Sequence, residues 1–268
     1  MSSHKFLFNL SFDKLLYSTN LHGFQFNFFN IKKNKNLILI GHSSKDLKKG
    51  NRQQSIKKII KNDFIWNKIE SESLNLMLNK IESYRLTEWI LIRILSKLGL
   101  LLYWKECNID FQISIKHISL QKNQLSKPFI KVFSNNNSIA DSIPFVSVSH
   151  SKKDVFIALC IKPVGIDTEL VENHSEAWKK RIFTKQEIKT LINFLKRWKN
   201  LAKETIYTII WSLKESTIKI QDNMTLGSLP EINISIANNN IVTKTPKNNI
   251  FYHNYISIND NSVLILTI

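Results

Sequence analysis

Three carboxylates in the C-terminal half of the sequence have the residue types and spacing of a divalent-cation site. Asp167 and Glu169 lie two positions apart in residues 164–169 (VGIDTE), a segment whose pattern predicts a short strand. Side chains two apart on a strand point to the same face, so these carboxylates should project together. Adjacent carboxylates repel each other, and a cation between them would relieve that repulsion.

The third carboxylate, Glu215, lies on a predicted amphipathic helix. Glu215 and Lys219 are four residues apart and therefore share one face of that helix. If the helix crosses the strand, three hard oxygen donors converge, which suits Mg²⁺ and not zinc, since zinc prefers His or Cys ligands. The core-facing positions that recur at helical spacing are Ile206, Ile209, Ile210, Leu213, Thr217 and Ile220.

Each feature has a simpler explanation when it is taken alone. Asp167 and Glu169 would be an exposed strand end, and Glu215 with Lys219 a surface ion pair worth roughly 0.3–0.5 kcal/mol. A single histidine such as His150 is more often structural than catalytic. The combination of these residues and their order along the chain favour a functional site.

Four short motifs occur in a fixed order: KP at residues 127–128, SHS at residues 149–151, GIDTE at residues 165–169 and WSLKESTIK at residues 211–219. Together they resemble the 4′-phosphopantetheinyl transferases of the surfactin-synthetase-activating type. Members of that family carry G-(I/V)-D-x-E and (F/W)-(S/T)-x-K-E-(S/A)-x-x-K segments. The resemblance covers roughly residues 80–230.

The resemblance implies an α+β fold, the 4′-phosphopantetheinyl transferase fold. That fold is a pseudo-dimer of two similar α/β halves, each with a small antiparallel sheet packed on helices. We expect residues 37–162 to form a first, coenzyme A-binding half and residues 163–268 a second half that binds Mg²⁺ and carries the catalytic residues. Residues 1–36 have no counterpart in the family and are interpreted as an extension.

The activity that the resemblance implies is transfer of 4′-phosphopantetheine from coenzyme A to a serine of an apo acyl or peptidyl carrier protein. The reaction depends on Mg²⁺, gives a holo carrier protein and 3′,5′-ADP, and is of the holo-[acyl-carrier-protein] synthase type. It would serve fatty acid, polyketide or nonribosomal peptide synthesis. By the same resemblance, Asp167, Glu169 and Glu215 are metal ligands. Glu215 is the base, directly or through a water held by the metal, and Lys219 stabilises the leaving group.

The resemblance also implies a set of coenzyme A contacts: Lys80, Arg85, Arg93, Lys127, Ser149, His150, Lys214 and Lys219. The arginines would bind the 3′-phosphate and adenosine end of the molecule. Two solvated arginines on an amphipathic helix are an equally good explanation of Arg85 and Arg93, because helix arginines are usually at the surface.

The chain is strongly basic, with a net charge of +17. Carrier proteins of this kind are acidic helical bundles, which a positive surface would attract at low salt. Two other functions are open: a nucleic-acid-binding protein, and an inactive relative that binds coenzyme A or carrier protein without chemistry. The lysines are scattered, part of the charge is what an AT-rich coding sequence produces, and no groove-reading motif is present, so we expect no nucleic-acid partner. The intact set of Asp167, Glu169, Glu215 and Lys219 argues against an inactive relative.

Cysteine content and hydropathy predict a cytoplasmic protein, and the two-halves architecture that the resemblance implies favours a monomer. The two cysteines, Cys107 and Cys160, are interpreted as free thiols in a reducing compartment. The most apolar stretch, residues 89–104, contains Arg93 and Lys97 and is too short for a membrane span. We find no convincing targeting segment and expect no membrane partner.

Local patterns predict several further elements. A long helix is expected over residues 73–98, with Gly99 as its terminator, and Thr184 with Glu187 forms a capping box at the start of another helix. Strands are expected over residues 109–115, 129–133, 145–149, 155–161, 232–236, 250–258 and 263–268.

Overall fold

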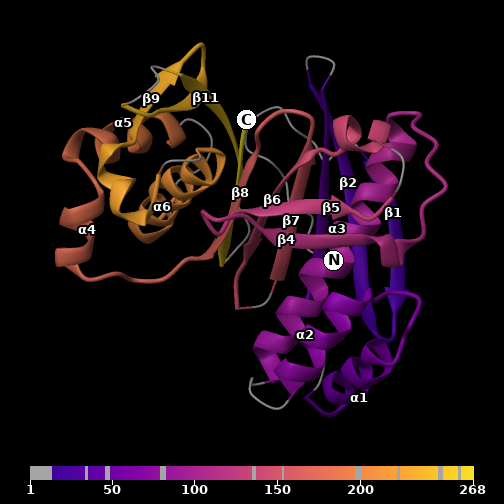
Figure 1. Cartoon of the computed structure of the whole chain (residues 1–268). Coiled ribbons are helices and arrows are strands. Elements are labelled where there is room, and N and C mark those ends of the chain that lie inside the picture. The colour runs from indigo at the N-terminus through magenta and orange to yellow at the C-terminus, as the bar shows by residue number, and fades with distance from the viewer. Residues whose placement is uncertain are drawn as a thin grey trace. The chain divides into compact units, whose positions relative to one another are not determined.

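The computed structural model describes residues 14–33, 36–45, 49–78, 83–134, 137–152, 154–196, 201–221, 224–246, 250–258 and 261–268 (Figure 1). The chain divides between Lys162 and Pro163 into two compact units, one containing Asp13–Lys162 and the other Pro163–Ile268. Helices pack on antiparallel sheets in both units. The predicted α+β class is confirmed.

The unit of residues 13–162 is built on a five-stranded antiparallel sheet with the order β1-β2-β3-β7-β6. Phe24, Phe26 and Phe28 alternate along the second strand and are all buried, as the period of a half-buried strand requires. The first two strands lie within residues 1–36, so the sheet continues across the predicted boundary at residue 36. The strands are β1 (Lys14–Leu21), β2 (Phe24–Lys33), β3 (Asn36–Ser44), β6 (Phe145–His150) and β7 (Asp154–Cys160).

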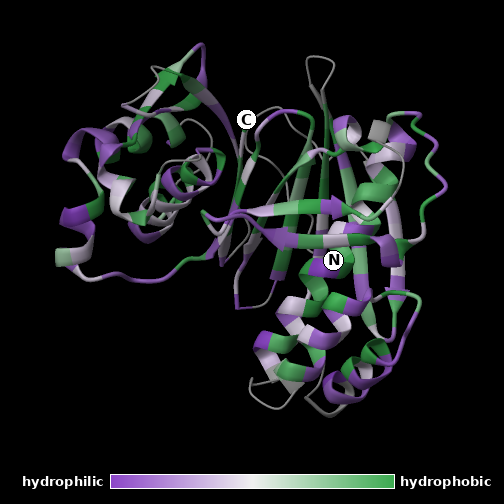
Figure 2. Ribbon diagram, viewed as in Figure 1, coloured by the Kyte–Doolittle hydropathy of each residue, from purple (hydrophilic) through white to green (hydrophobic). Residues whose placement is uncertain are grey.

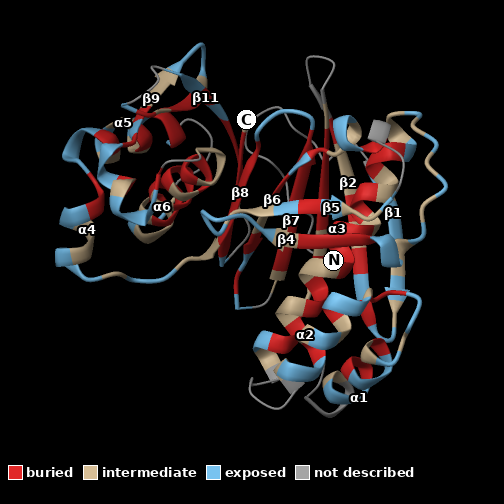
Figure 3. Cartoon of the chain, in the orientation of Figure 1, coloured by how far each residue is buried: buried red, intermediate tan, exposed pale blue. Residues whose placement is uncertain are grey.

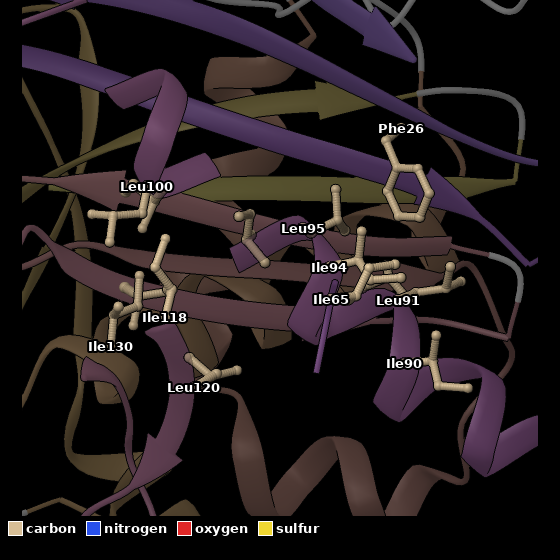
Figure 4. Close-up of a cluster of buried hydrophobic side chains, with 14 of the residues drawn as sticks. Phe26, Ile65, Ile90, Leu91, Ile94, Leu95, Leu100, Ile118, Leu120 and Ile130 are labelled. Carbon is tan, nitrogen blue, oxygen red and sulfur yellow. The ribbon is translucent and has the colours of Figure 1, made fainter. Parts of the chain in front are cut away.

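A long helix, α3 (Ser83–Glu106), packs on β3 and β7 and supplies much of the core of this unit. Figure 4 shows its buried side chains Ile90, Leu91, Ile94 and Leu95 within the apolar cluster. The predicted end of this helix at Gly99 is wrong. A Cβ there would lie 2.8 Å from Leu159 Cδ1, so the glycine permits close packing on β7 and does not terminate the helix.

The chain leaves α3 at Asn108, which has a φ of 57°. Asparagine tolerates this left-handed conformation better than most residues, which makes it a suitable helix terminator. The strand predicted over residues 109–115 is also wrong. Ile109, Phe111 and Ile113 pack against the core cluster without strand pairing, and the strand begins only at Ile118.

The predicted helix over residues 73–98 is in fact two helices, α2 (Lys68–Leu78) and α3, and residues 79–82 lie outside the described part of the chain. The remaining elements of this unit are α1 (Lys49–Ile60), the 3₁₀ turns η1 (Ile115–His117) and η2 (Asn137–Ser142), and a hairpin of β4 (Ile118–Lys122) and β5 (Pro128–Val132).

The unit that contains Pro163–Ile268 is built on a second five-stranded antiparallel sheet with the order β8-β12-β11-β10-β9. The helix α6 (Lys203–Ile220) packs mainly on β8 and β12. Figure 3 shows β8 buried over most of its length and much of α6 buried. The strands are β8 (Gly165–Leu170), β9 (Asn233–Ala237), β10 (Asn240–Lys244), β11 (Phe251–Ile258) and β12 (Ser262–Thr267).

Two shorter helices and a 3₁₀ turn complete this unit: α4 (Glu176–Ile182), α5 (Lys185–Leu195) and η3 (Leu226–Glu231). The capping box of α5 is confirmed, because the Thr184 side chain accepts a hydrogen bond from Glu187 N while the Glu187 side chain accepts one from Thr184 N. Figure 2 shows that α4 is mostly hydrophilic. Among the helices of the described residues, none is both long and apolar enough to span a membrane.

Candidate metal centre

The strand β8 carries Asp167 and Glu169 at the edge of its sheet. Among the described strands it pairs with β12 alone, where Asp167 is opposite Ile265 and Glu169 is opposite Val263. Since the two carboxylates are two residues apart, they lie on the same face of the strand, as the sequence predicts. Asp167 is buried and Glu169 is half-buried.

The helix α6 approaches this strand unusually closely at Gly165. A Cβ at Gly165 would lie 1.9 Å from the Ser216 carbonyl oxygen, so only glycine allows the observed separation of helix and strand. Ser216 is the residue after Glu215, so the close approach brings the Glu215 carboxylate to β8. One carboxylate oxygen from each of Asp167, Glu169 and Glu215 lies within 4.8 Å of the others.

Burial and neighbouring carboxylates raise the pKa values of Glu169 and Glu215. Burial, followed by repulsion from Asp167 and Glu215, raises the pKa of Glu169 from about 4.5 to about 7. Burial and repulsion from Asp167 also raise the pKa of Glu215. The neighbouring Trp211 side chain lowers both pKa values, but it offsets only part of the increase.

Lys219 supplies the positive charge within the cluster. Its Nζ donates to Asp167 Oδ1 at 2.8 Å and to the Ile166 carbonyl oxygen at 2.9 Å, and it lies 3.5 Å from Glu215 Oε1. Burial alone would lower the pKa of Lys219, but the Asp167 and Glu215 carboxylates more than compensate and raise it. Lys219 therefore stays charged at neutral pH and links β8 to α6.

The donor set fits a hard divalent cation. When all three carboxylates are ionised, Asp167, Glu169 and Glu215 carry three negative charges against the single charge of Lys219. After burial, repulsion within this cluster is the next largest cause of the raised pKa values of Glu169 and Glu215. A divalent ion would neutralise it, and carboxylate oxygens are the ligands that Mg²⁺ prefers in proteins.

The position of Lys214 contradicts the prediction that it contacts coenzyme A phosphates. Its side chain is fully buried, and Nζ donates to the Ile182 carbonyl oxygen at 3.0 Å and forms an ion pair with Glu187 Oε1 at 2.9 Å. The next residue along a helix points about 100° away, so Lys214 faces α5 while Glu215 faces β8. Lys214 is a structural link between α5 and α6.

The other residues implied to bind coenzyme A belong to the unit of residues 13–162. At the end of β6, His150 is exposed and its Nε2 lies 3.1 Å from Glu88 Oε1, while Ser149 before it is buried. Glu88 Oε2 also accepts a hydrogen bond from Lys45 Nζ at 2.8 Å. Glu88 therefore connects α3 to the end of β6 and to the residue after β3.

The remaining predicted contacts differ in their environment. Arg85 is exposed on the first turn of α3, and Lys127 is half-buried before β5. Arg93 stacks over the Trp89 ring, with its guanidinium carbon 3.5 Å from the ring centroid, and burial lowers its pKa to about 10. Lys80 lies outside the described residues. The structure does not test the coenzyme A contacts, and they stay predictions.

Two residues of these sites were missed in the sequence. Trp211 precedes Glu215 by four residues, as Glu215 precedes Lys219, so the spacing of the motif already placed all three on one helix face. Glu88 gave no such signal, because its partners Lys45 and His150 are distant in the chain.

Comparison with known proteins agrees with this geometry for the second unit. Residues 163–264 match the family model described as the 4′-phosphopantetheinyl transferase superfamily. A search of curated proteins finds no match to the chain. The matched span includes Asp167, Glu169, Trp211, Glu215 and Lys219. Residues 163–264 are thus identified as a domain of the 4′-phosphopantetheinyl transferase superfamily, which supports a transferase function.

Proposed function

We propose that this protein transfers 4′-phosphopantetheine from coenzyme A to a serine hydroxyl of an apo acyl or peptidyl carrier protein. The observation that carries the proposal is the convergence of Asp167, Glu169 and Glu215 within the span that matches the transferase superfamily. A superfamily match alone would be compatible with an inactive relative. An assembled acidic cluster with Lys219 beside it favours an active enzyme.

Asp167, Glu169 and Glu215 would hold Mg²⁺, which supplies positive charge against the pyrophosphate of coenzyme A when it is bound. Glu169 and Glu215 are half-buried, so these two residues are partly accessible to solvent. The buried Asp167 is fixed by Lys219, so it provides the most rigid of the three ligands.

Glu215 is the proposed general base. A serine hydroxyl is a weak nucleophile and needs a proton acceptor as its oxygen attacks the β-phosphorus. As that bond forms, the bond from the β-phosphorus to the bridging oxygen breaks, and its electron pair leaves on 3′,5′-ADP. The ammonium of Lys219 next to Glu215 offsets the negative charge that grows on the leaving group.

The unit of residues 13–162 is proposed to bind coenzyme A through Arg85, Lys127, Ser149 and His150, with Lys80 and Arg93 as further candidates. Exposure of Arg85 and His150 is consistent with contact to an anionic ligand. We also propose that the two units are similar halves of a pseudo-dimer. Each has a five-stranded antiparallel sheet and one long helix packed on it, α3 in one and α6 in the other.

An acidic carrier protein is the proposed partner. The helices α4 and α5 of the transferase domain expose the basic side chains of Lys180, Arg181, Lys185 and Lys189. Exposed charges of one sign attract a partner of the opposite sign over roughly 10 Å at 0.1 M salt. Transfer to an acidic carrier should therefore slow as salt is added, mainly through a higher KM for the carrier.

The proposal is tested by the intact mass of an apo acyl carrier protein, and separately of an apo peptidyl carrier domain. Each is incubated with this protein, coenzyme A and Mg²⁺, with and without a chelator. A mass gain equal to phosphopantetheine that the chelator prevents is the expected result. If neither carrier gains mass while coenzyme A binds, the active-enzyme proposal is wrong for these carriers and the inactive relative is favoured.

Substitutions of the acidic residues test whether phosphopantetheine transfer takes place at the cluster of Asp167, Glu169 and Glu215. We expect Asp167→Asn and Glu215→Gln to abolish transfer in a folded protein. Glu204→Gln makes the same chemical change on the first turn of the same helix and should retain transfer. Near-normal activity in Glu215→Gln would remove Glu215 from the catalytic role.

A further inference from the structure

A chain of buried polar side chains fastens α6 to its sheet directly behind the metal centre. Ser216 Oγ lies 2.6 Å from Thr267 Oγ1 on β12, and Thr267 Oγ1 donates to Asn254 Oδ1 on β11 at 2.6 Å. On the other side, Asn254 Nδ2 donates to Thr243 Oγ1 on β10 at 3.2 Å, and Thr243 Oγ1 lies 2.7 Å from Thr217 Oγ1. All five residues are buried. We call them the α6 hydrogen-bond chain.

The direction of these hydrogen bonds can be worked out from proton counting. Asn254 Nδ2 also faces the carbonyl oxygens of Tyr252 at 3.1 Å and Ile241 at 3.4 Å, which accept only, so the amide cannot be reversed. The single proton of Thr267 therefore goes to Asn254 Oδ1. Because Thr267 has no second proton, its 2.6 Å contact with Ser216 requires Ser216 to donate, in competition with the longer 3.1 Å contact between Ser216 Oγ and the Leu213 carbonyl oxygen.

The α6 hydrogen-bond chain has two arms that meet at Asn254, one through Thr267 to Ser216 and one through Thr243 to Thr217. In the second arm the hydrogen bonds point away from Asn254. Thr217 donates its single proton to the Leu213 carbonyl oxygen at 2.7 Å. Its contact with Thr243 therefore requires Thr243 to donate, which leaves Thr243 to accept from Asn254 Nδ2. Asn254 thus accepts from one arm and donates to the other. Neither a carboxylate nor an apolar side chain can do both.

Apolar packing by itself does not fix the rotation of a helix on a sheet. The contacts of Ile209, Ile210 and Leu213 are non-directional, whereas hydrogen bonds have preferred angles and short distances. The two arms hold Ser216 and Thr217, which are consecutive and lie about 100° apart around the helix. Two attachments at different angles oppose rotation in both directions.

That rotation determines where Glu215 points. Side-chain atoms of a helix lie about 5–6 Å from its axis, so a rotation by about 15° would move the Glu215 carboxylate by about 1.5 Å. Metal–ligand distances tolerate about 0.2 Å. A helix free to rotate by even a few degrees would therefore lose one of the three ligands.

We propose that Asn254 is a positioning residue for the metal centre: through the α6 hydrogen-bond chain it sets the rotation of α6 and so places the Glu215 carboxylate beside β8. Asn254 contacts none of the three carboxylates in any described interaction. The inference rests on the proposed function, because it concerns the cation site that the transfer reaction would use. The inference adds Asn254, which lies on the central strand β11 and is far in sequence from the motifs at residues 165–169 and 211–219.

The test measures binding of Mn²⁺ to the full chain by the loss of the free-ion EPR signal, which needs no catalysis. Thr267→Val and Thr243→Val each remove one arm while keeping the side-chain shape. We expect each variant to weaken Mn²⁺ binding about 3- to 10-fold. Asn254→Leu should have a larger effect but leaves several buried groups unpaired, so the single-hydroxyl variants decide the question if it does not fold.

Two controls separate positioning from loss of stability. Thr267→Ser keeps the hydroxyl and should bind Mn²⁺ within about twofold of the unsubstituted chain. Thr208→Val removes a buried hydroxyl from α6 that bonds only within its own helix, to the Glu204 carbonyl oxygen at 2.9 Å. It should lower the unfolding midpoint without weakening Mn²⁺ binding.

Unchanged Mn²⁺ affinity in both Thr267→Val and Thr243→Val would overturn the inference, as would equal weakening in Thr208→Val. Absence of Mn²⁺ binding by the unsubstituted chain would overturn it together with the metal centre. If the unsubstituted chain binds Mn²⁺ but transfers no phosphopantetheine, the proposed function fails alone, and the variants still decide the role of Asn254.

Discussion

Replacing Gly165 by alanine should separate α6 from β8 and disrupt the metal centre without touching a ligand. The added Cβ would lie 1.9 Å from the Ser216 carbonyl oxygen and 2.8 Å from the Ser216 carbonyl carbon. Both are backbone atoms, so no side-chain rotation can relieve the clash. Carbon and oxygen need more than about 3.2 Å, as even weak C–H···O contacts do, so helix and strand must move apart by about 1.3 Å.

Two magnitudes follow from that displacement. Overpacking a core costs typically 1–3 kcal/mol, and a contact between two backbone segments belongs at the upper end, so we expect a loss of about 3 kcal/mol in unfolding free energy. A shift of about 1.3 Å also exceeds the tolerance of metal–ligand distances several-fold. Binding of Mn²⁺ should therefore weaken by at least about tenfold, comparable to the loss of a group that orients a ligand.

The assay combines urea unfolding with Mn²⁺ titration by EPR on the same preparations. Gly227→Ala is the matched control, because among the described residues a Cβ at Gly227 meets Thr225 Oγ1 alone, at an ordinary 3.5 Å. Gly227→Ala should change neither the unfolding free energy nor the Mn²⁺ affinity by much. A Gly165→Ala protein with the unfolding midpoint and Mn²⁺ affinity of the unsubstituted chain would refute the argument that this glycine sets the helix–strand separation.

Three further outcomes are expected. Without divalent metal, stability should fall by about 1–2 kcal/mol as pH rises from about 4.5 to about 7, because the folded protein holds the Glu169 proton more tightly than the unfolded chain does. Denaturation at several pH values checks this, and Glu169→Gln should show a weaker dependence, leaving the part that the raised pKa of Glu215 contributes. Lys214→Met should cost about 3 kcal/mol by leaving the buried Glu187 carboxylate without its cation, and adding Glu187→Gln should recover part of that loss in the same unfolding assay. His150→Ala should raise the KM for coenzyme A with little change in kcat; an unchanged KM in steady-state kinetics would leave the pair of His150 and Glu88 a structural one.

Local periodicity was sufficient to predict the elements that carry the metal centre. The two-residue spacing of Asp167 and Glu169 and the four-residue spacing of Glu215 and Lys219 are properties of a strand and a helix, whatever packs on them. The capping box at Thr184 is equally local. These features could be predicted because each depends on residues fewer than five positions apart.

Features that depend on a distant partner could not be predicted. Gly99 has the sequence signature of a helix terminator, yet its role is to let α3 approach β7. A buried lysine such as Lys214 cannot be recognised without knowing that Glu187 lies opposite.

One local signal was overlooked. The strand β10 was not predicted, although Asn238 and Asn239, both with positive φ, form a two-residue turn before it, and consecutive asparagines are a sequence signal for such a turn.

The candidate metal centre depends on groups outside it because its three carboxylates repel one another. Carboxylates held within 4.8 Å tend to push α6 away from β8, and after burial this repulsion is the next cause of the raised pKa values of Glu169 and Glu215. Lys219 opposes it with a single charge. The remaining resistance must come from packing, where Gly165 sets how near the helix lies and Asn254 sets how it is rotated. Both constraints act on Ser216, one at its carbonyl oxygen and one at its hydroxyl. The position of the Glu215 carboxylate is therefore determined at Ser216, the residue that follows it in the sequence.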